Sequence, residues 1–126
     1  MILGTGIDII EVQRIETAVE KFGDRFLQRI LLPGELEYCQ SHKSPGAFLA
    51  ARFAAKEAIS KAFGTGIGAQ LAWHDMEVCR KESGEPYVKL HGKGEDLLHA
   101  RGGRIVHLSL SHTAGHAAAM AILESA

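Results

Sequence analysis

The amino-acid sequence predicts an α+β fold. Apolar residues recur at helical spacing through the first half of the chain, whereas the second half holds short strand-like runs. Those runs come in pairs separated by turns, so they predict antiparallel hairpins. Helices mixed with paired strands favour α+β over a regular repeat of parallel strands and crossover helices.

The N-terminal region predicts one strand and two helical segments. The first ten residues read as a buried strand, because MILGTGIDII is rich in isoleucine and apolar apart from two glycines, a threonine and Asp8. From Glu11 the spacing becomes that of an amphipathic helix, with a break expected near Gly23. Its apolar positions are Val12, Ile15, Val19, Phe22 and Phe26. A short helix is expected over 33–40, where a proline opens the first turn.

The longest helix is predicted from Ser44-Pro45 to about Phe63, since this segment is rich in alanine and stops at Gly64. The second half adds two strand pairs and a helix. The strands are expected over 76–81 and 87–90, around a turn at 83–86, and over 104–111 and 116–123, with a helix over 92–101.

Composition narrows the class of protein. The chain has 126 residues, a usual length for one domain, and we expect a single domain over 1–126. With 14 basic and 15 acidic residues we expect no nucleic-acid partner, and with no run of roughly 18 apolar residues we expect no membrane span. Two cysteines and the lack of a signal-peptide pattern favour a reducing, cytoplasmic location. Because so short a chain has little room for a deep cleft, we expect an active site shared between subunits.

Two carboxylates stand in apolar surroundings. Asp8 interrupts the N-terminal strand, and Glu57 interrupts the alanine-rich helix. A buried carboxylate costs several kcal/mol unless it is paired, hydrogen-bonded or bound to a cation. Mg²⁺ takes one or two protein carboxylates and completes its octahedron with phosphate oxygens and water, so the two residues are a candidate metal site. The alternative is that Asp8 caps the following helix and Glu57 lies on a solvated face.

Basic residues accompany Glu57 along the same helix. Lys61 follows it by one turn, and Arg52 precedes Lys56 by one turn. This spacing can place an ammonium beside a metal-bound phosphate, with Arg52 as a further anion contact. The alternative is an ordinary surface ion pair between Glu57 and Lys61, worth only about 0.2–0.5 kcal/mol.

The remaining short motifs carry less chemistry. The stretch Gly64-Thr65-Gly66-Ile67-Gly68 follows a helix and matches neither phosphate-binding glycine motif, so it predicts a helix cap and a tight turn. His107 and His112 would point to opposite faces of one strand, which argues against a zinc site of His107, His112 and His116. A serine–histidine–acid triad lacks the GxSxG turn that would support it.

The first predicted helix carries a basic stripe beside its apolar face. At 100° per residue, Arg14, Lys21 and Arg25 lie within about 40° of one another. The stripe is either an ordinary solvated face or a docking surface for an acidic partner.

Taken in order, these blocks resemble one family over nearly the whole chain. The blocks are GIDIIEV at 6–12 with Arg14-Ile15, FLQRIL at 26–31 with Glu35, RFAAKEA at 52–58, KAFGTGI at 61–67, GEP at 84–86 with Leu90 and Gly92, and LSLSH at 108–112. They are similar to those of holo-[acyl-carrier-protein] synthase, the small bacterial type of 4′-phosphopantetheinyl transferase.

The resemblance implies an antiparallel sheet packed with a long helix, in a homotrimer with sites at subunit interfaces. It implies transfer of 4′-phosphopantetheine from coenzyme A to a serine of apo acyl carrier protein, with release of adenosine 3′,5′-bisphosphate. Asp8 and Glu57 would hold Mg²⁺, and Lys61 would lie near the phosphates. The coenzyme A site would include Arg52, Lys61, Gly64, Gly66 and His112. Carrier docking would use Arg14, Lys21 and Arg25.

Two alternatives from other classes remain at this point. One is a Mg²⁺-dependent phosphohydrolase that uses the same carboxylates. The other is a non-enzymatic module that binds the carrier protein through its basic helix.

Overall fold

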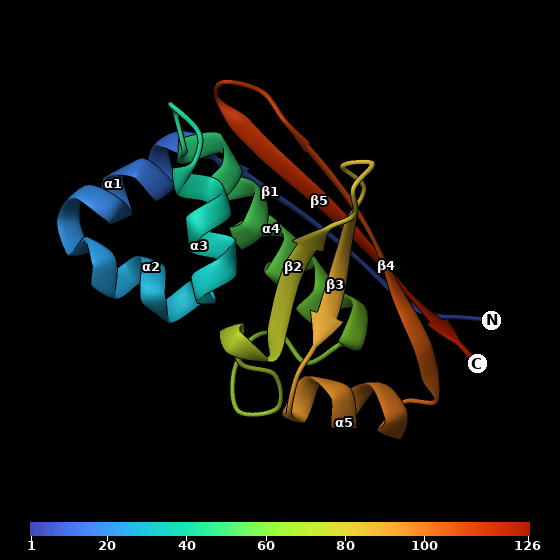
Figure 1. Ribbon diagram of the computed structural model, residues 1–126. Helices are drawn as coiled ribbons and strands as arrows, with labels where there is room; N and C mark the ends of the chain where they lie inside the picture. Colours follow the sequence, from blue (N-terminus) through green and yellow to red (C-terminus); the bar gives the residue numbers. More distant parts are fainter.

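The computed structural model describes residues 1–126 and confirms the α+β class (Figure 1). Every predicted strand and helix is present, with ends shifted by at most a few residues. The elements are β1 (Ile2–Glu11), α1 (Val12–Phe22), α2 (Asp24–Ile30), α3 (Pro33–Gln40), α4 (Gly46–Phe63), a 3-10 turn η1 (Trp73–Asp75), β2 (Met76–Arg80), β3 (Pro86–Leu90), α5 (Lys93–Ala100), β4 (Gly103–His112) and β5 (His116–Ser125). The expected helix break falls at Gly23, whose φ of 60° ends α1 before α2 begins. None of the helices combines the length and hydrophobicity needed to span a bilayer.

The strands form two antiparallel sheets. β1, β5 and β4 make a three-stranded sheet in the order β1-β5-β4, while β2 and β3 form a separate hairpin. The long helix α4 packs against β1 and β5. α1, α2 and α3 gather on one side of α4, and α5 lies at the foot of the β2–β3 hairpin (Figure 1).

Small residues let the sheet approach α4 closely. A Cβ added to Gly6 would lie 1.9 Å from the Ala58 carbonyl oxygen, and one added to Gly4 would lie 2.0 Å from that of Ala62. Only glycine therefore fits at these two positions of β1. β5 contributes buried alanines to the core beside them, at Ala117, Ala119 and Ala121.

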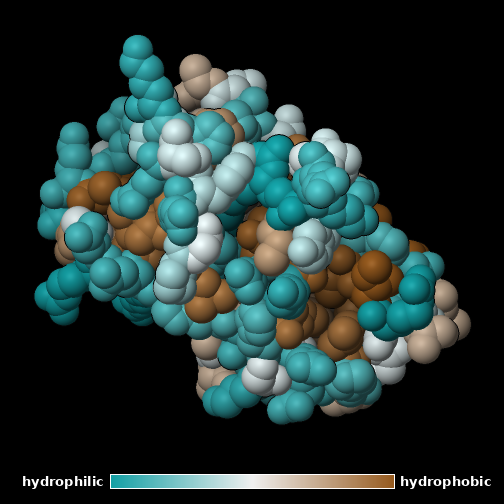
Figure 2. Space-filling view, viewed as in Figure 1, coloured by the Kyte–Doolittle hydropathy of each residue, from teal (hydrophilic) through white to brown (hydrophobic).

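β1 is less buried than predicted. Its side away from α4 leaves Ile7 68% and Ile9 70% exposed, and Met120, the β5 partner of Ile7, is 45% exposed. The prediction of a buried strand was wrong because β1 is an edge strand and α4 covers only one of its faces. On the face shown in Figure 2, apolar side chains also gather over α1 and α2 and between the β2–β3 hairpin and β4.

A buried ion pair fixes the orientation of α4. The Lys56 ammonium lies 2.7 Å from Glu35 Oε1, and both side chains are shielded from solvent. Lys56 also donates to the carbonyls of Ile30 at 2.6 Å and Trp73 at 3.2 Å. Glu35 accepts a further hydrogen bond from the backbone N–H of Val78. These bonds join α4 to α2, α3, η1 and β2, and they leave the ammonium with three acceptors.

Candidate active site

The contact between β1 and α4 brings Asp8 to the last turns of α4. Alternate residues of a strand share a face, so Asp8 follows Gly4 and Gly6 on the side of β1 that faces α4. The Lys61 ammonium lies 3.2 Å from Asp8 Oδ1 and donates a hydrogen bond to the Ile7 carbonyl at 2.9 Å. The Lys61 side chain is 51% exposed and that of Asp8 18%, so the pair opens to solvent.

Glu57 joins Asp8 and Lys61 at this site. Burial raises the pKa of the Glu57 carboxyl above its ordinary value, the negative charge of Asp8 raises it further, and the Lys61 ammonium opposes both effects. The structure therefore brings together the three residues predicted to carry the chemistry. Lys61 pairs with Asp8 across elements and not with Glu57 along the helix, so the surface-pair interpretation was wrong. No side chain caps the start of α1, so Asp8 is not a helix cap.

The two carboxylates suit a hard cation such as Mg²⁺. The chain has no group of three or more His, Cys, Asp or Glu residues that could hold a metal ion. Mg²⁺ needs only one or two protein carboxylates when phosphate oxygens and waters supply its other ligands. The donor chemistry of Asp8 and Glu57 therefore fits Mg²⁺ together with a phosphate, and these two residues would hold it.

The predicted glycine turn closes α4. Gly64, with φ of 79°, is the left-handed cap, and Gly66 also has a positive φ of 65°. The amide of Gly64 donates to the Lys61 carbonyl, while those of Thr65 and Gly66 donate to the Ser60 carbonyl. These amides are engaged within the helix end, so they do not form a free phosphate cradle. Open space around Gly66 leaves this turn accessible to a ligand.

A second polar cluster surrounds Tyr38. The guanidinium carbons of Arg52 and Arg80 lie 4.5 and 4.9 Å from the centroid of its ring. Arg52 is only 3% exposed, its Nε has no hydrogen-bond partner, and it takes part in no ion pair. Burial lowers the pKa of the Arg52 guanidinium. A buried guanidinium without a counter-ion is a ready partner for a phosphate group.

His112 belongs to the same cluster. Its ring meets that of Phe48 edge-on at 4.9 Å between centroids, and Phe48 stacks on His42 at 3.6 Å. His42 in turn contacts the ring of Tyr38. Arg52 and His112, both predicted for the coenzyme A site, are therefore linked by a continuous set of aromatic contacts.

Within one chain the two clusters lie apart. Arg52 precedes Lys61 by nine residues on α4, which places them on about opposite sides of the helix at 100° per residue. Asp8 lies on the edge strand β1 and His112 on the other edge strand β4, with β5 between them. Of the predicted coenzyme A-binding residues, Lys61 lies beside Asp8, whereas Arg52 and His112 do not converge with that site on one pocket of a single chain.

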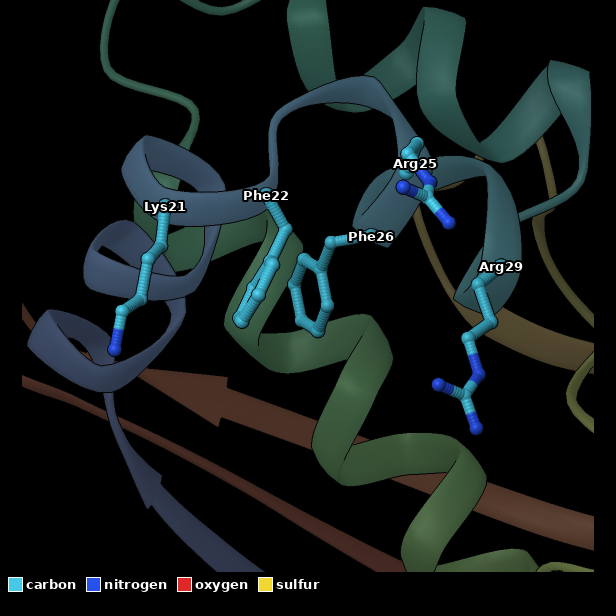
Figure 3. A pocket seen from close by; sticks show the side chains of 5 residues that line it. All are labelled: Lys21, Phe22, Arg25, Phe26 and Arg29. Carbon is cyan, nitrogen blue, oxygen red and sulfur yellow. The ribbon is translucent and has the colours of Figure 1, made fainter.

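Lys21 and Arg25 line a hollow of about 500 Å³ at the junction of α1 and α2, together with Phe22, Phe26 and Arg29. Figure 3 shows the two phenyl rings next to each other, with Lys21 and Arg29 extending on either side of them. Cations and exposed aromatic surface thus alternate around one depression.

Arg14 lines a different hollow, of about 250 Å³, with Ile9, Ile10, Glu11 and His116. The predicted stripe assumed one continuous helix. Since the break at Gly23 separates α1 from α2, Arg25 does not follow Arg14 at 100° per residue.

Several residues at or near the site were missed. Gly6 allows the approach of Asp8 to α4, and its alternation with Gly4 and Asp8 is visible in the sequence. Tyr38 and Arg80 lie far apart along the chain, and no local pattern connects them to Arg52. Phe22 was identified as an apolar helix position, yet it is 60% exposed.

Comparison with known proteins places this arrangement in a family. Residues 4–121 match the family model described as the 4′-phosphopantetheinyl transferase superfamily. The chain belongs to the 4′-phosphopantetheinyl transferase superfamily. It is 53% identical to the holo-[acyl-carrier-protein] synthase of Koribacter versatilis, over 98% of this chain and 99% of that relative.

Solved structures of the superfamily share the fold. The holo-[acyl-carrier-protein] synthase of Neisseria meningitidis matches with a TM-score of 0.93 at 35% identity, over 99% of this chain and 100% of that one. The enzyme of Helicobacter pylori, solved in complex with coenzyme A, matches with a TM-score of 0.86 at 32% identity, over 95% and 99%. The resemblance identified from the sequence blocks, and the transferase fold that it implies, are confirmed.

Proposed function

We propose that the chain transfers 4′-phosphopantetheine from coenzyme A to a serine of apo acyl carrier protein and releases adenosine 3′,5′-bisphosphate. The observation that carries this proposal is the Asp8, Glu57 and Lys61 site in a member of the phosphopantetheinyl transferase superfamily. The relatives are named for this carrier protein, and one was solved with coenzyme A.

The reaction moves charge toward groups that this site can stabilise. The serine oxygen forms a bond to the β-phosphorus, and the bond from that phosphorus to the departing adenosine 3′,5′-bisphosphate oxygen breaks. Negative charge grows on the departing phosphate, where the exposed Lys61 ammonium stabilises it. Glu57, the carboxylate that lies beside Asp8 and Lys61, is assigned as the acceptor of the serine proton. Mg²⁺, held by Asp8 and Glu57, would supply charge neutralisation of the phosphate oxygens.

Coenzyme A binding uses the Tyr38 cluster and the turn after α4. The Arg52 guanidinium lies over the Tyr38 ring with no hydrogen-bond partner at Nε, and Arg80 lies against the same ring. These cations suit a phosphate remote from the reacting pyrophosphate, and His112 helps to hold the ligand. Gly64 and Gly66 form the open turn along which the ligand passes.

The separation of the two clusters supports a homotrimer with shared sites. One chain presents Asp8 and Lys61 on one side of α4, and a neighbouring chain supplies Arg52 and His112. The uncovered face of the sheet is suited to such an assembly, since Ile7, Ile9 and Met120 are exposed there. Both cysteines are free thiols, which fits the expected reducing cytoplasm.

Mixing two inactive variants tests the shared site. Asp8→Ala and Arg52→Ala chains should each be inactive alone and regain part of the wild-type rate after subunit exchange, because mixed trimers contain interfaces with both residues intact. Analytical ultracentrifugation would verify the trimer and the exchange. Absence of recovery in verified mixed trimers would show that each site lies within one chain.

The hollow between α1 and α2 is proposed to dock the carrier. Lys21 and Arg25 favour an acidic surface, and Phe22 and Phe26 offer apolar contact beside them. Arg14, at the start of α1, extends the contact toward β1. Arg14→Glu and Arg25→Glu should raise the KM for the carrier and weaken its salt dependence. Arg104→Glu, on β4, is the matched control and should leave that KM unchanged.

One assay separates the proposed reaction from its alternatives. The purified chain is incubated with coenzyme A, Mg²⁺ and apo acyl carrier protein, and the carrier is analysed by mass spectrometry. A mass gain of one phosphopantetheine group supports transfer. Cleavage of coenzyme A without any carrier would indicate a phosphohydrolase, and carrier binding without product would indicate a binding module.

A further inference from the structure

Side chains at the two ends of helix α5 donate hydrogen bonds to the two ends of the loop that follows α4. The Arg101 guanidinium, at the C-terminal end of α5, donates a hydrogen bond to the Phe63 carbonyl. Lys93, the first residue of α5, donates from its ammonium to the Ala69 carbonyl at 3.2 Å. The segment between these anchor points, 64–70, contains the glycine turn.

Arg101 provides the Phe63 carbonyl with a hydrogen-bond donor that the residues following α4 do not provide. The last carbonyls of a helix have no partner within it. The amides after α4 donate to the carbonyls of Ser60 and Lys61, whereas the Phe63 carbonyl accepts from Arg101. A cation at this position also complements the negative end of the α4 dipole.

α5 is itself firmly placed, so it can serve as a support. A Cβ added to Gly94 would lie 2.7 Å from the Asp75 carbonyl oxygen, which shows how closely α5 packs against η1. The His91 amide donates to the same carbonyl just before the helix begins. By contrast, a Cβ added to Gly66 or Gly68 would meet nothing within 4 Å, and glycine loses more conformational freedom than any other residue when it is ordered. The two anchors therefore add to the few bonds that the loop makes by itself, from the amides of Thr65, Gly66 and Gly68, and to the packing of Ile67.

We infer that Arg101, assisted by Lys93, is a positioning residue that orders the 64–70 loop for coenzyme A. This inference rests on the proposed function, because it assigns the loop to the coenzyme A site. Arg101 acts through Phe63 and the glycine turn. Arg101 makes no hydrogen bond to Asp8 or Lys61. The Lys61 ammonium bonds instead to the Ile7 carbonyl and to Asp8, both on β1. Loss of Arg101 should therefore weaken coenzyme A binding more than it slows the chemical step.

Hydrogen–deuterium exchange of the free protein tests the ordering directly. In Arg101→Ala, and more so in Arg101→Ala/Lys93→Ala, the 64–70 amides should exchange about fivefold faster or more, with unchanged protection in β4 and β5. Arg101→Lys keeps the charge and should restore part of the protection. Arg104→Ala removes an exposed arginine that pairs with Glu124, and it should match the wild type. Equal exchange in wild type and both alanine variants would overturn the inference.

Kinetics then test the purpose of the ordering. Arg101→Ala should raise the KM for coenzyme A about tenfold while kcat stays within about twofold, and Arg101→Lys should recover most of the loss. Faster loop exchange with an unchanged KM would overturn the assignment of the loop to coenzyme A. If the wild type lacks transferase activity, the proposed function fails and the positioning role for coenzyme A fails with it, whereas the exchange data still decide whether Arg101 orders the loop.

Discussion

Replacing Gly6 by alanine should separate β1 from α4 and disable the site. The added Cβ would lie 1.9 Å from the Ala58 carbonyl oxygen and 2.8 Å from the Ala62 amide nitrogen. Since an ordinary van der Waals contact begins at 3.4 Å, the strand and helix must move apart by about 1.5 Å. The obstructing atoms are backbone atoms of a buried helix, so no side chain can turn aside to relieve the clash.

The expected loss of stability is at the upper end for overpacking, about 3 kcal/mol or more. Without the clash, alanine in a strand would instead be favoured over glycine by about 0.5–1 kcal/mol. Gly6→Ala should therefore lower stability if β1 contacts α4 this closely, and raise it slightly if it does not. The same displacement moves Asp8 away from Lys61, now 3.2 Å apart. A misplacement of about 1 Å can cost a hundredfold in rate, so transfer should fall by roughly that factor.

Urea denaturation followed by circular dichroism measures the stability, and the carrier mass assay measures the rate. Gly115→Ala is the matched control, because nothing lies within 4 Å of its added Cβ. It should leave both quantities near wild type. A Gly6→Ala protein as stable and as active as that control would refute the close-approach explanation.

Three further perturbations probe the core and the site. Lys56→Met leaves Glu35 charged and buried without its partner, and should lower the free energy of unfolding by about 3–5 kcal/mol in urea denaturation. Adding Glu35→Gln should recover part of the lost stability, whereas a loss below about 1 kcal/mol in Lys56→Met alone would contradict the importance of the pair. Burial raises the pKa of the Cys39 thiol from 9.0 to about 11, so the unfolded state ionises first and stability should fall by roughly 2–3 kcal/mol between pH 9 and pH 11. Cys39→Ala should lose this part of the pH dependence, and an identical profile would contradict it. Burial and Asp8 raise the pKa of Glu57 above 4.5, so the folded state keeps this proton to a higher pH than the unfolded state does. Stability should therefore fall as pH rises from 4.5 through the raised value, and Glu57→Gln should remove this fall and melt at a higher temperature at pH 7. An unchanged thermal profile would show that Glu57 is not desolvated.

The elements were predictable because their signals are local. The apolar spacing of α1, the positive φ that glycine permits at Gly23, and the glycine that ends α4 all act within a few residues. Burial of β1 was overestimated because its apolar residues occupy both faces, and the sequence does not show that α4 covers only one. The exposed Ile7 and Ile9 are explained by position in the sheet, a property of the whole fold.

The candidate site was predictable in its members and less so in its contacts. Asp8 and Glu57 were identified as carboxylates in apolar segments, and the order of blocks linked them to one family. The choice of Asp8 as the partner of Lys61 depends on how closely β1 approaches α4. The position of Arg52 beside Tyr38 and Arg80 depends on α3 and β2, which lie far from it in sequence.

The rate of carrier modification in Asp8→Ala tests the central claim most directly. Wild type, Asp8→Ala and Glu57→Ala are compared with coenzyme A, apo carrier and limiting Mg²⁺, with ultracentrifugation and circular dichroism to verify assembly and fold. We predict correctly folded variants that add no detectable phosphopantetheine while the wild type modifies the carrier fully. Near-normal modification by either variant at limiting Mg²⁺ would contradict the assignment of these carboxylates to the reaction.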